Sequence, residues 1–345
     1  MNPHALFIIS SSLIAGTITT LLSFHWLLAW IGLEINTLAI IPLMTKNPHP
    51  RAIEAATKYF LTQATASAMI LFSSTLNAWF SGEWAINNLS HPLAIMTLTI
   101  ALTMKLGLAP FHFWLPEVLQ GLTLQTGLIL STWQKLAPMA LLLQLSPSLN
   151  LELMMLIGIT STILGGWGGI NQTQLRKILA FSSIAHLGWM ITIMKFAPNL
   201  SLFNFVIYLL MTSALFITFI SLSSKKMTDL ASSWTKTPVL TTLTMLVLLS
   251  LAGLPPLSGF MPKWFIAQEM INQNLLMFTS IILLSTLLSL FFYLRLTYIM
   301  TLTLAPNSST SMMIWRNSNK TVSAILITLA LALIPLSPTL ITLTS

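Results

Sequence analysis

The sequence predicts an all-α polytopic membrane protein, with about eleven transmembrane helices arranged as two inverted repeats that each contain a broken helix. Of its 345 residues, 55% are hydrophobic and only 6% are charged, and the mean hydropathy of +0.84 lies far above that of soluble globular proteins. Apolar stretches of about 20 residues recur along nearly the whole chain, which is the length that a helix needs to cross a bilayer. Strands of a membrane barrel would instead alternate polar and apolar residues over about 10 positions. Two apolar stretches are also interrupted by similar glycine-proline segments, which predicts the two broken helices.

The predicted spans follow one another closely along the chain. We place them at residues 4–22, 24–44, 52–80, 92–121, 124–145, 150–170, 174–196, 199–222, 238–272, 275–302 and 322–342. Two of these spans are interrupted, one near 107–110 and the other near 253–259, where glycine and proline occur together. A helix cannot continue unchanged through such a pair, so we expect each of these two spans to be discontinuous.

The connections are short, and Asn, Pro and Ser mark them. The longest polar connections are predicted at 223–237 and 303–321. We therefore expect a single membrane domain over 1–345, with a first half-repeat at 24–145 and a second at 150–302.

The distribution of basic residues predicts the orientation of the spans, because loops on the inner side of a membrane carry an excess of Lys and Arg. The loops on the N-terminal side hold Lys46, Arg51, Arg176, Lys177, Lys225, Lys226, Lys236, Arg316 and Lys320. The opposite loops hold only Lys195 among basic residues, together with Glu83 and Glu152. The N-terminus is therefore predicted on the positive-inside face and the C-terminus on the other.

The two interruptions are related in sequence. Gly107–Pro116 aligns without a gap on Gly253–Pro262, with Gly, Leu, Pro, an aromatic residue and a second Pro in register. The interruptions fall in the fourth and ninth predicted spans, an odd number of spans apart, so the two broken helices cross the membrane in opposite directions. Lys105 lies before the first interruption and Lys263 after the second. Broken helices in corresponding places of two inverted halves indicate the working site of a transporter.

Charged side chains inside the spans are the strongest candidates for function. Lys105, Lys135 and Lys263 each lie within an apolar span, where a charge costs roughly 2.5–3.5 kcal/mol on insertion scales. Glu34 is the one acid in the middle of a span. A nearby carboxylate favours the charged form of a lysine and burial disfavours it, so making or breaking such a pair can load or unload a proton. The structural alternative is a set of snorkelling lysines and a static Glu–Lys bridge.

Two histidines rank next as candidates. His112 lies at the first interruption and His186 in the middle of its span, and neutral imidazoles can pass protons along a hydrated chain. An imidazole bonded to a backbone carbonyl is an equally good interpretation of each. No third ligand is spaced to join His112 and Glu117, so the sequence predicts no metal site.

Other charged residues and glycines are predicted to be structural. Glu54 and Lys58 have the spacing of a pair on one helix face at the membrane interface. Arg295 is predicted to snorkel and Glu117 to anchor a helix end at the interface. Gly165–Gly169 lacks the strand and the Gly-Lys-Ser/Thr of a phosphate loop, so close helix packing is the expected role.

Composition excludes several other functions. The chain has no cysteine, which excludes disulfides, thiolate catalysis, cysteine-ligated zinc and iron–sulfur clusters within it. The net charge of +8 does not indicate a nucleic-acid partner, because the basic residues are too scattered to form a patch. The first residues show neither a cleavable signal peptide nor an Arg-rich transit peptide, so we expect either that the first helix is its own insertion signal or that the protein is made in the compartment that uses it.

Four segments together resemble a known family: Met104–Glu117, Trp133–Lys135, Asn171–Gln174 and Gly253–Trp264. They are similar to the antiporter-like membrane subunits of mitochondrial NADH:ubiquinone oxidoreductase, respiratory complex I. The resemblance covers essentially the whole chain. The G-L-x-P pattern near a lysine also occurs in multi-subunit cation/proton antiporters.

The resemblance implies two inverted bundles of about five helices, each with a discontinuous helix and a half-channel. It also implies a role for each buried charge. Glu34 would modulate Lys105, Lys135 would connect the two halves, and Lys263 would terminate the proton relay. Two histidines would be accessory groups on the polar axis: His112 and His186.

The same resemblance implies a core subunit of an H⁺-translocating NADH:ubiquinone reductase in the mitochondrial inner membrane, with the N-terminus in the matrix and the C-terminus in the intermembrane space. This chain would bind no cofactor, since NAD, ubiquinone, FMN and the iron–sulfur clusters are used by other subunits. Its partners would be other membrane-arm subunits and the lipid bilayer, including cardiolipin. The chain resembles the animal mitochondrial form, which lacks the first helices of the full-length pattern.

Two other functions compete with this one. A secondary cation/proton antiporter would bind sodium, for which carboxylates near the breaks would be expected instead of lysines. A structural spacer that only joins neighbouring subunits would tolerate replacement of its buried lysines by Met.

Overall fold

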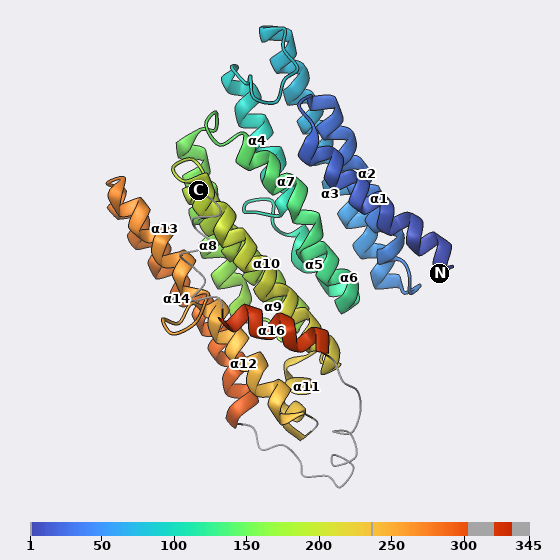
Figure 1. Cartoon of the computed structure of the whole chain (residues 1–345), viewed down its shortest axis with the longest axis vertical. Helices are drawn as coiled ribbons and strands as arrows, with labels where there is room; N and C mark the ends of the chain where they lie inside the picture. Colours follow the sequence, from blue (N-terminus) through green and yellow to red (C-terminus); the bar gives the residue numbers. More distant parts are fainter. Residues whose placement is uncertain (1, 236, 303–320, 333–345) are drawn as a thin grey trace. The chain divides into compact units, whose positions relative to one another are not determined.

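The structure is a computed structural model that describes residues 2–235, 237–302 and 321–332 (Figure 1). In the described part of the chain the regular elements are helices, and pairing of extended segments is limited to two isolated bridges. The chain divides into two compact units, Met1–Thr160 and Ser161–Ser345. The boundary between them falls inside one helix, α8 (Leu151–Ile170).

The first unit is built from seven helices and the first half of α8. These are α1 (Pro3–Leu22), α2 (Trp26–Met44), α3 (Pro50–Ser81), α4 (Pro92–Leu106), α5 (Trp114–Gly121), α6 (Leu124–Ser131) and α7 (Trp133–Gln144). Three of them begin with proline at the first helical position, where the missing N–H costs nothing. The side chains of His25 and His49 accept hydrogen bonds from the first backbone N–H groups of α2 and α3, which fixes where these helices begin.

The second unit continues from α8 to the last described helix. Its elements are α9 (Leu175–Ile193), α10 (Pro198–Ser221), α11 (Met227–Ala231), the 3₁₀ helix η1 (Ser232–Thr235), α12 (Pro238–Ala252), α13 (Phe260–Asn272), α14 (Leu276–Leu302) and α16 (Thr321–Ala332). The predicted connection 303–321 and most of the last predicted span, 322–342, lie outside the described residues.

Each span predicted between residues 4 and 302 coincides with one helix or with consecutive helical segments. By length and composition, five of the described helices are able to cross a membrane: α1, α2, α8, α10 and α14. The helix α3 has 32 residues but a more polar sequence, and the segments of the interrupted helices are shorter. The all-helical, membrane-embedded fold class is therefore confirmed.

Both predicted interruptions occur. Gly107 and Gly253 end α4 and α12 in the left-handed region, with φ values of 77° and 86°, a conformation that glycine adopts without the steric cost of a Cβ. The two helix ends also share their hydrogen bonds. The N–H groups of Gly107 and Leu108 donate to Met104 and Thr103, and those of Gly253 and Leu254 donate to Ser250 and Leu249 in the same order. Each interruption is thus a Schellman cap.

One prediction of local structure was wrong, and one predicted connection contains short helices. The span 124–145 is not continuous but divides at Thr132 (φ −112°, ψ −69°), between α6 and α7. The N–H and the hydroxyl of Thr132 both donate to the carbonyl of Leu128, at 3.0 and 2.7 Å. The predicted polar connection 223–237 contains α11 and η1, and the Asp229 carboxylate accepts from two backbone N–H groups at the start of α11.

The glycine run in α8 has the packing role that the sequence predicts. A Cβ at Gly165 would lie 2.7 Å from the backbone nitrogen of Ala185 in α9, and one at Gly166 would lie 2.8 Å from the Cβ of Leu288 in α14. Only residues without a Cβ allow the helices to approach this closely. This part of α8 therefore forms a tight junction with α9 and α14.

Candidate functional site

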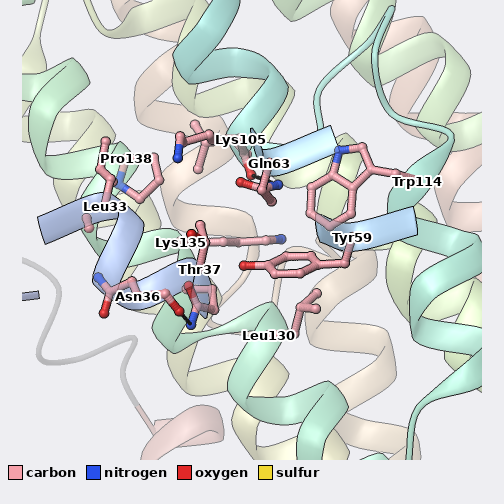
Figure 2. Close-up of a pocket in the computed structure, with 13 residues that line it drawn as sticks. Leu33, Asn36, Thr37, Tyr59, Gln63, Lys105, Trp114, Leu130, Lys135 and Pro138 are labelled. Carbon is pink, nitrogen blue, oxygen red and sulfur yellow. Dashed lines mark hydrogen bonds between the residues drawn. The ribbon is translucent and has the colours of Figure 1, made fainter. Parts of the chain in front are cut away.

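A small cavity with several polar side chains in its wall lies within the first unit, next to the interruption between α4 and α5 (Figure 2). Residues from α2, α3, α4, α5, α6 and α7 line it. Its polar lining residues are Asn36, Thr37, Tyr59, Gln63, Lys105, Gln134 and Lys135. So many polar groups inside an apolar helical bundle indicate a functional cavity.

Lys105 occupies the last turn of α4, and only 5% of its surface is exposed. Its Nζ atom has no hydrogen-bond partner among the described residues. Glu34 on α2 lies within electrostatic range of Lys105, although no ion pair joins the two in the part of the chain that the structure describes. The Thr37 hydroxyl hydrogen-bonds to the Glu34 carboxylate at 2.9 Å. This geometry differs from the static Glu–Lys bridge considered from the sequence, because the two side chains form no ion pair among the described residues.

Lys135 reaches the same cavity from α7, three residues after the irregular backbone at Thr132. It is 3% exposed, and its backbone N–H donates to the carbonyl of Thr132 at 3.3 Å. The structure therefore places two of the three predicted lysines, Lys105 and Lys135, on one cavity, where Figure 2 shows them projecting from different helices.

Neutral side chains cap the carbonyl end of α4. The indole of Trp114 donates to the carbonyl of Met104 at 3.2 Å, and the amide of Gln63 donates to the carbonyl of Lys105 at 3.5 Å. The backbone at this interruption therefore does not need the lysine ammonium as a hydrogen-bond donor.

Lys263 has a different position in the second unit. It lies on α13, after the interruption, and its Nζ donates to the carbonyls of Leu251 and Ala252 at 3.2 and 3.0 Å. The ammonium thus caps the C-terminal end of α12, where the helix dipole favours a positive charge. In the alignment of the two interruptions Lys263 occupies the position of Glu117. Lys105 therefore precedes its helix break in the chain, whereas Lys263 follows its own.

His186 borders a second, smaller cavity in the second unit. The cavity is also lined by Asn204, Tyr208 and Leu251, the last of which accepts a hydrogen bond from Lys263. The Nε2 atom of His186 lies 3.5 Å from the hydroxyl of Tyr293. His186 is thus part of a polar cluster adjacent to the second helix break.

Several polar residues at or beside these cavities are absent from the predicted site. All of them lie inside predicted spans, and each is at most 4% exposed: Tyr59, Gln63, Asn204, Tyr208 and Tyr293. Tyr293 lies beside the second cavity, where its hydroxyl is next to His186. A search of the spans for uncharged polar side chains, in addition to charged ones, could have found them.

His112 does not line either cavity. It lies in the segment between α4 and α5, is 5% exposed, and bonds to the backbone of Pro110. Its ring packs against Phe113 with 4.2 Å between centroids. These contacts match the alternative of an imidazole bonded to a backbone carbonyl. Within the described residues no group of three or more His, Cys, Asp or Glu side chains is placed to hold a metal ion.

Two of the residues predicted to be structural have partners that the sequence did not indicate. Lys58 pairs with Glu54 at 2.6 Å, as predicted, and also with Glu117 on α5 at 2.7 Å. Arg295, which the sequence predicts to snorkel, donates through its guanidinium to the carbonyl of Gln172 beyond the end of α8. Its Nε has no hydrogen-bond partner among the described residues, and snorkelling stays a prediction.

Comparison with known proteins identifies the class to which this fold and these cavities belong. The family model described as NADH:quinone oxidoreductase/Mrp antiporter, TM matches residues 23–289, and the model of the NADH dehydrogenase subunit 2 C-terminus matches residues 290–341. The chain is therefore an antiporter-like membrane subunit.

Curated relatives place the chain more closely. It is 63% identical over 343 residues to NADH-ubiquinone oxidoreductase chain 2 of Aquarana catesbeiana, and the match covers 99% of each chain. The same protein of Xenopus laevis is 61% identical over 346 residues, covering 99% of this chain and 100% of the relative. The chain belongs to the NADH-ubiquinone oxidoreductase chain 2 family.

Solved structures share the fold. A chain of respiratory complex I from Thermus thermophilus superposes with a TM-score of 0.82 at 27% identity, covering 94% of this chain and 78% of that chain. A chain of the Mrp complex from Dietzia sp. DQ12-45-1b gives a TM-score of 0.79 at 15% identity, covering 96% and 73% of the two chains. At 15% identity the likeness concerns the fold alone.

Proposed function

We propose that this protein is a core membrane subunit of complex I that translocates protons across the mitochondrial inner membrane, coupled to NADH oxidation and ubiquinone reduction on other subunits. Membership of the NADH-ubiquinone oxidoreductase chain 2 family supports the assignment. The main support for the mechanism is the cavity at the first helix break. Lys105 and Lys135 both line this cavity, and Glu34 lies on α2, which also contributes to its wall. The chain itself performs no redox chemistry.

In the proposed relay, protons pass among the three buried lysines through hydrated cavities. Glu34 favours the charged form of Lys105, so a change in the carboxylate's charge or position would make Lys105 release or take up a proton. Lys135 shares the cavity and would receive that proton and connect the two half-channels. Lys263 would terminate the relay. Two histidines would act as accessory groups: His112 and His186.

The finer architecture belongs to the same proposal. We expect eleven transmembrane helices in two inverted half-repeats, 24–145 and 150–302, with the N-terminus in the matrix and the C-terminus in the intermembrane space. The partners would be other membrane-arm subunits and lipids including cardiolipin. NAD, ubiquinone, FMN and iron–sulfur clusters would be bound by other subunits.

Replacement of Lys105 by Met in the assembled complex tests the relay. The coupled proton flux is expected to fall about tenfold or more, since each 1.4 kcal/mol added to a barrier slows a step about tenfold. The measurement is the number of protons transported per NADH oxidised in proteoliposomes that contain the purified complex. The matched control is Lys46→Met, which removes an exposed lysine from the connection between α2 and α3. An assembled Lys105→Met complex with the flux of the control would show that the relay assignment is wrong.

A second candidate, a secondary cation/proton antiporter, is favoured by the family description, which includes Mrp antiporters, and by the shared fold. Lysines at both helix breaks favour protons over a metal cation, because they repel it. Sodium-dependent proton flux in the absence of NADH would support this candidate. A structural spacer, the third function, would retain full pumping in the Lys105→Met complex.

A further inference from the structure

The second cavity contains a buried amide that has no assigned role. Asn204, on α10, is 3% exposed, lines this cavity, and its Nδ2 has no hydrogen-bond partner among the described residues. We infer that Asn204 holds an ordered water in the cavity and thereby links His186 to the helix break that Lys263 caps. This inference rests on the proposed function and makes Asn204 a positioning residue of the relay.

The first argument is the hydrogen-bonding capacity of Asn204. A buried amide N–H is costly unless it is bonded, and such groups in proteins almost always find a protein or water partner. One neighbour on the cavity wall already accepts a hydrogen bond. The Leu251 carbonyl accepts from Lys263, although a carbonyl oxygen retains a second lone pair for water.

The second argument is the space and its lining. The cavity has room for about one water molecule, and an internal water needs two to four polar partners. Three of the residues that line it are polar: Asn204, His186 and Tyr208. The apolar remainder of the wall, which includes Ile207 and Met211, would restrict the water to these partners.

The position of the cavity gives the water its function. Leu251 lines the cavity and accepts from the Lys263 ammonium, and Pro262, the neighbour of Lys263 in the chain, also lines it. Lys263 is not among the residues that line the cavity, and Leu251, whose carbonyl accepts from Lys263, is the residue that connects them. The water that Asn204 holds would therefore join His186 to the backbone at this helix break, and the inference includes no direct proton transfer from Lys263 to that water.

The experiment compares variants of Asn204 in the assembled complex. Asn204→Leu keeps the approximate volume and removes the N–H donor, and we expect the proton flux per NADH oxidised to fall about threefold to tenfold. Asn204→Ser restores a donor and leaves room for water, so it should retain at least about half of the flux. The matched control, Asn272→Leu, makes the same exchange at an exposed asparagine at the end of α13 and should leave the flux unchanged. A cryo-EM map that resolves buried waters should show one within about 3.2 Å of Asn204 Nδ2, and the Asn204→Leu map should lack it.

The outcomes separate this inference from the proposed function. Assembly is checked by NADH oxidation with an artificial electron acceptor, which does not require the membrane relay. If Lys263→Met lowers the flux and Asn204→Leu does not, the water bridge is wrong and the relay stands. If Asn204→Ser is as impaired as Asn204→Leu, or the native cavity is dry, Asn204 has only a packing role. If Lys263→Met retains full flux, the role of Lys263 in the relay fails, and the inference about Asn204 fails with it.

Discussion

At the scale of single residues, the two lysines at the helix breaks are held in different ways. Lys105 extends into a polar cavity, and neutral donors from Gln63 and Trp114 satisfy the carbonyls at the end of its helix. Lys263 donates to two carbonyls at the end of α12 and so holds the two segments of its broken helix together. Both lysines lie near a helix C-terminus, Lys105 buried and Lys263 half-buried, but only Lys263 is a hydrogen-bond donor to the backbone there. Their removal should therefore have opposite effects on stability.

The stability of the assembled complex should reveal this difference. Lys263→Met leaves two backbone carbonyls without their donor, and we expect a loss of about 1–3 kcal/mol. Lys105→Met removes a buried charge that makes no hydrogen bond, so its effect should be neutral or stabilising. The measurement is the temperature at which half of the complex dissociates on native gels, with Lys263→Arg as the control that retains a donor. Equal losses in Lys105→Met and Lys263→Met would contradict the assigned contacts.

At the scale of elements, glycine decides how closely the segments of the broken helix can approach. A Cβ at Gly259 would lie 1.9 Å from the carbonyl oxygen of Ser250, on the preceding segment. The start of α13 therefore packs directly against the last turn of α12. Gly82, at the end of α3, has a φ of 75° but no atom within 4 Å of an added Cβ, so its requirement for glycine is conformational only.

Alanine substitutions distinguish a glycine that is required for close packing from one that is required for its left-handed backbone. Gly259→Ala should cost about 3 kcal/mol or more, because backbone atoms must move to relieve the overlap. Gly82→Ala should cost only about 1–2 kcal/mol, the penalty for a left-handed residue with a Cβ. Thermal dissociation of the complex measures both. A Gly259→Ala complex as stable as the Gly82→Ala complex would show that α12 and α13 do not approach this closely.

At the scale of the whole molecule, the distribution of basic residues predicts which loops face the matrix. Lys225 and Lys226 precede α11 and are exposed, and Glu83 is exposed between α3 and α4. The positive-inside rule places the first pair on the matrix side and Glu83 on the opposite side.

Proteolysis from each side of the membrane tests this topology. Trypsin is expected to cleave after Lys225 or Lys226 in inverted inner-membrane vesicles and not in mitoplasts. A glutamate-specific protease should cleave after Glu83 in mitoplasts and not in inverted vesicles, which provides a matched control for accessibility. The fragments would be identified by mass spectrometry, and the opposite pattern would reverse the assigned orientation.

The sequence predicts those features that leave a local chemical pattern. Glycine and proline mark the breaks at Gly107 and Gly253, and apolar length marks the helices. The irregular backbone at Thr132 was missed because a threonine within an apolar run carries no such mark. The role of Asn204 and the partner of Arg295 depend on residues distant in sequence, which come together only through packing. The lysines could be predicted as candidates because a buried charge is costly. The hydrogen bonds that distinguish Lys263 from Lys105 could not be predicted, because they depend on how two helices pack.

The different caps at the two breaks have a mechanical consequence. Because Gln63 and Trp114 are neutral, they hold the end of α4 equally well whether Lys105 is charged or not. The end of α12 is held by a group that itself titrates, and a neutral amine forms weaker hydrogen bonds with carbonyls than an ammonium does. In the proposed relay the first break would therefore keep its hydrogen bonds whatever the charge on Lys105. At the second break, loss of a proton from Lys263 would weaken the hydrogen bonds that join α13 to the end of α12.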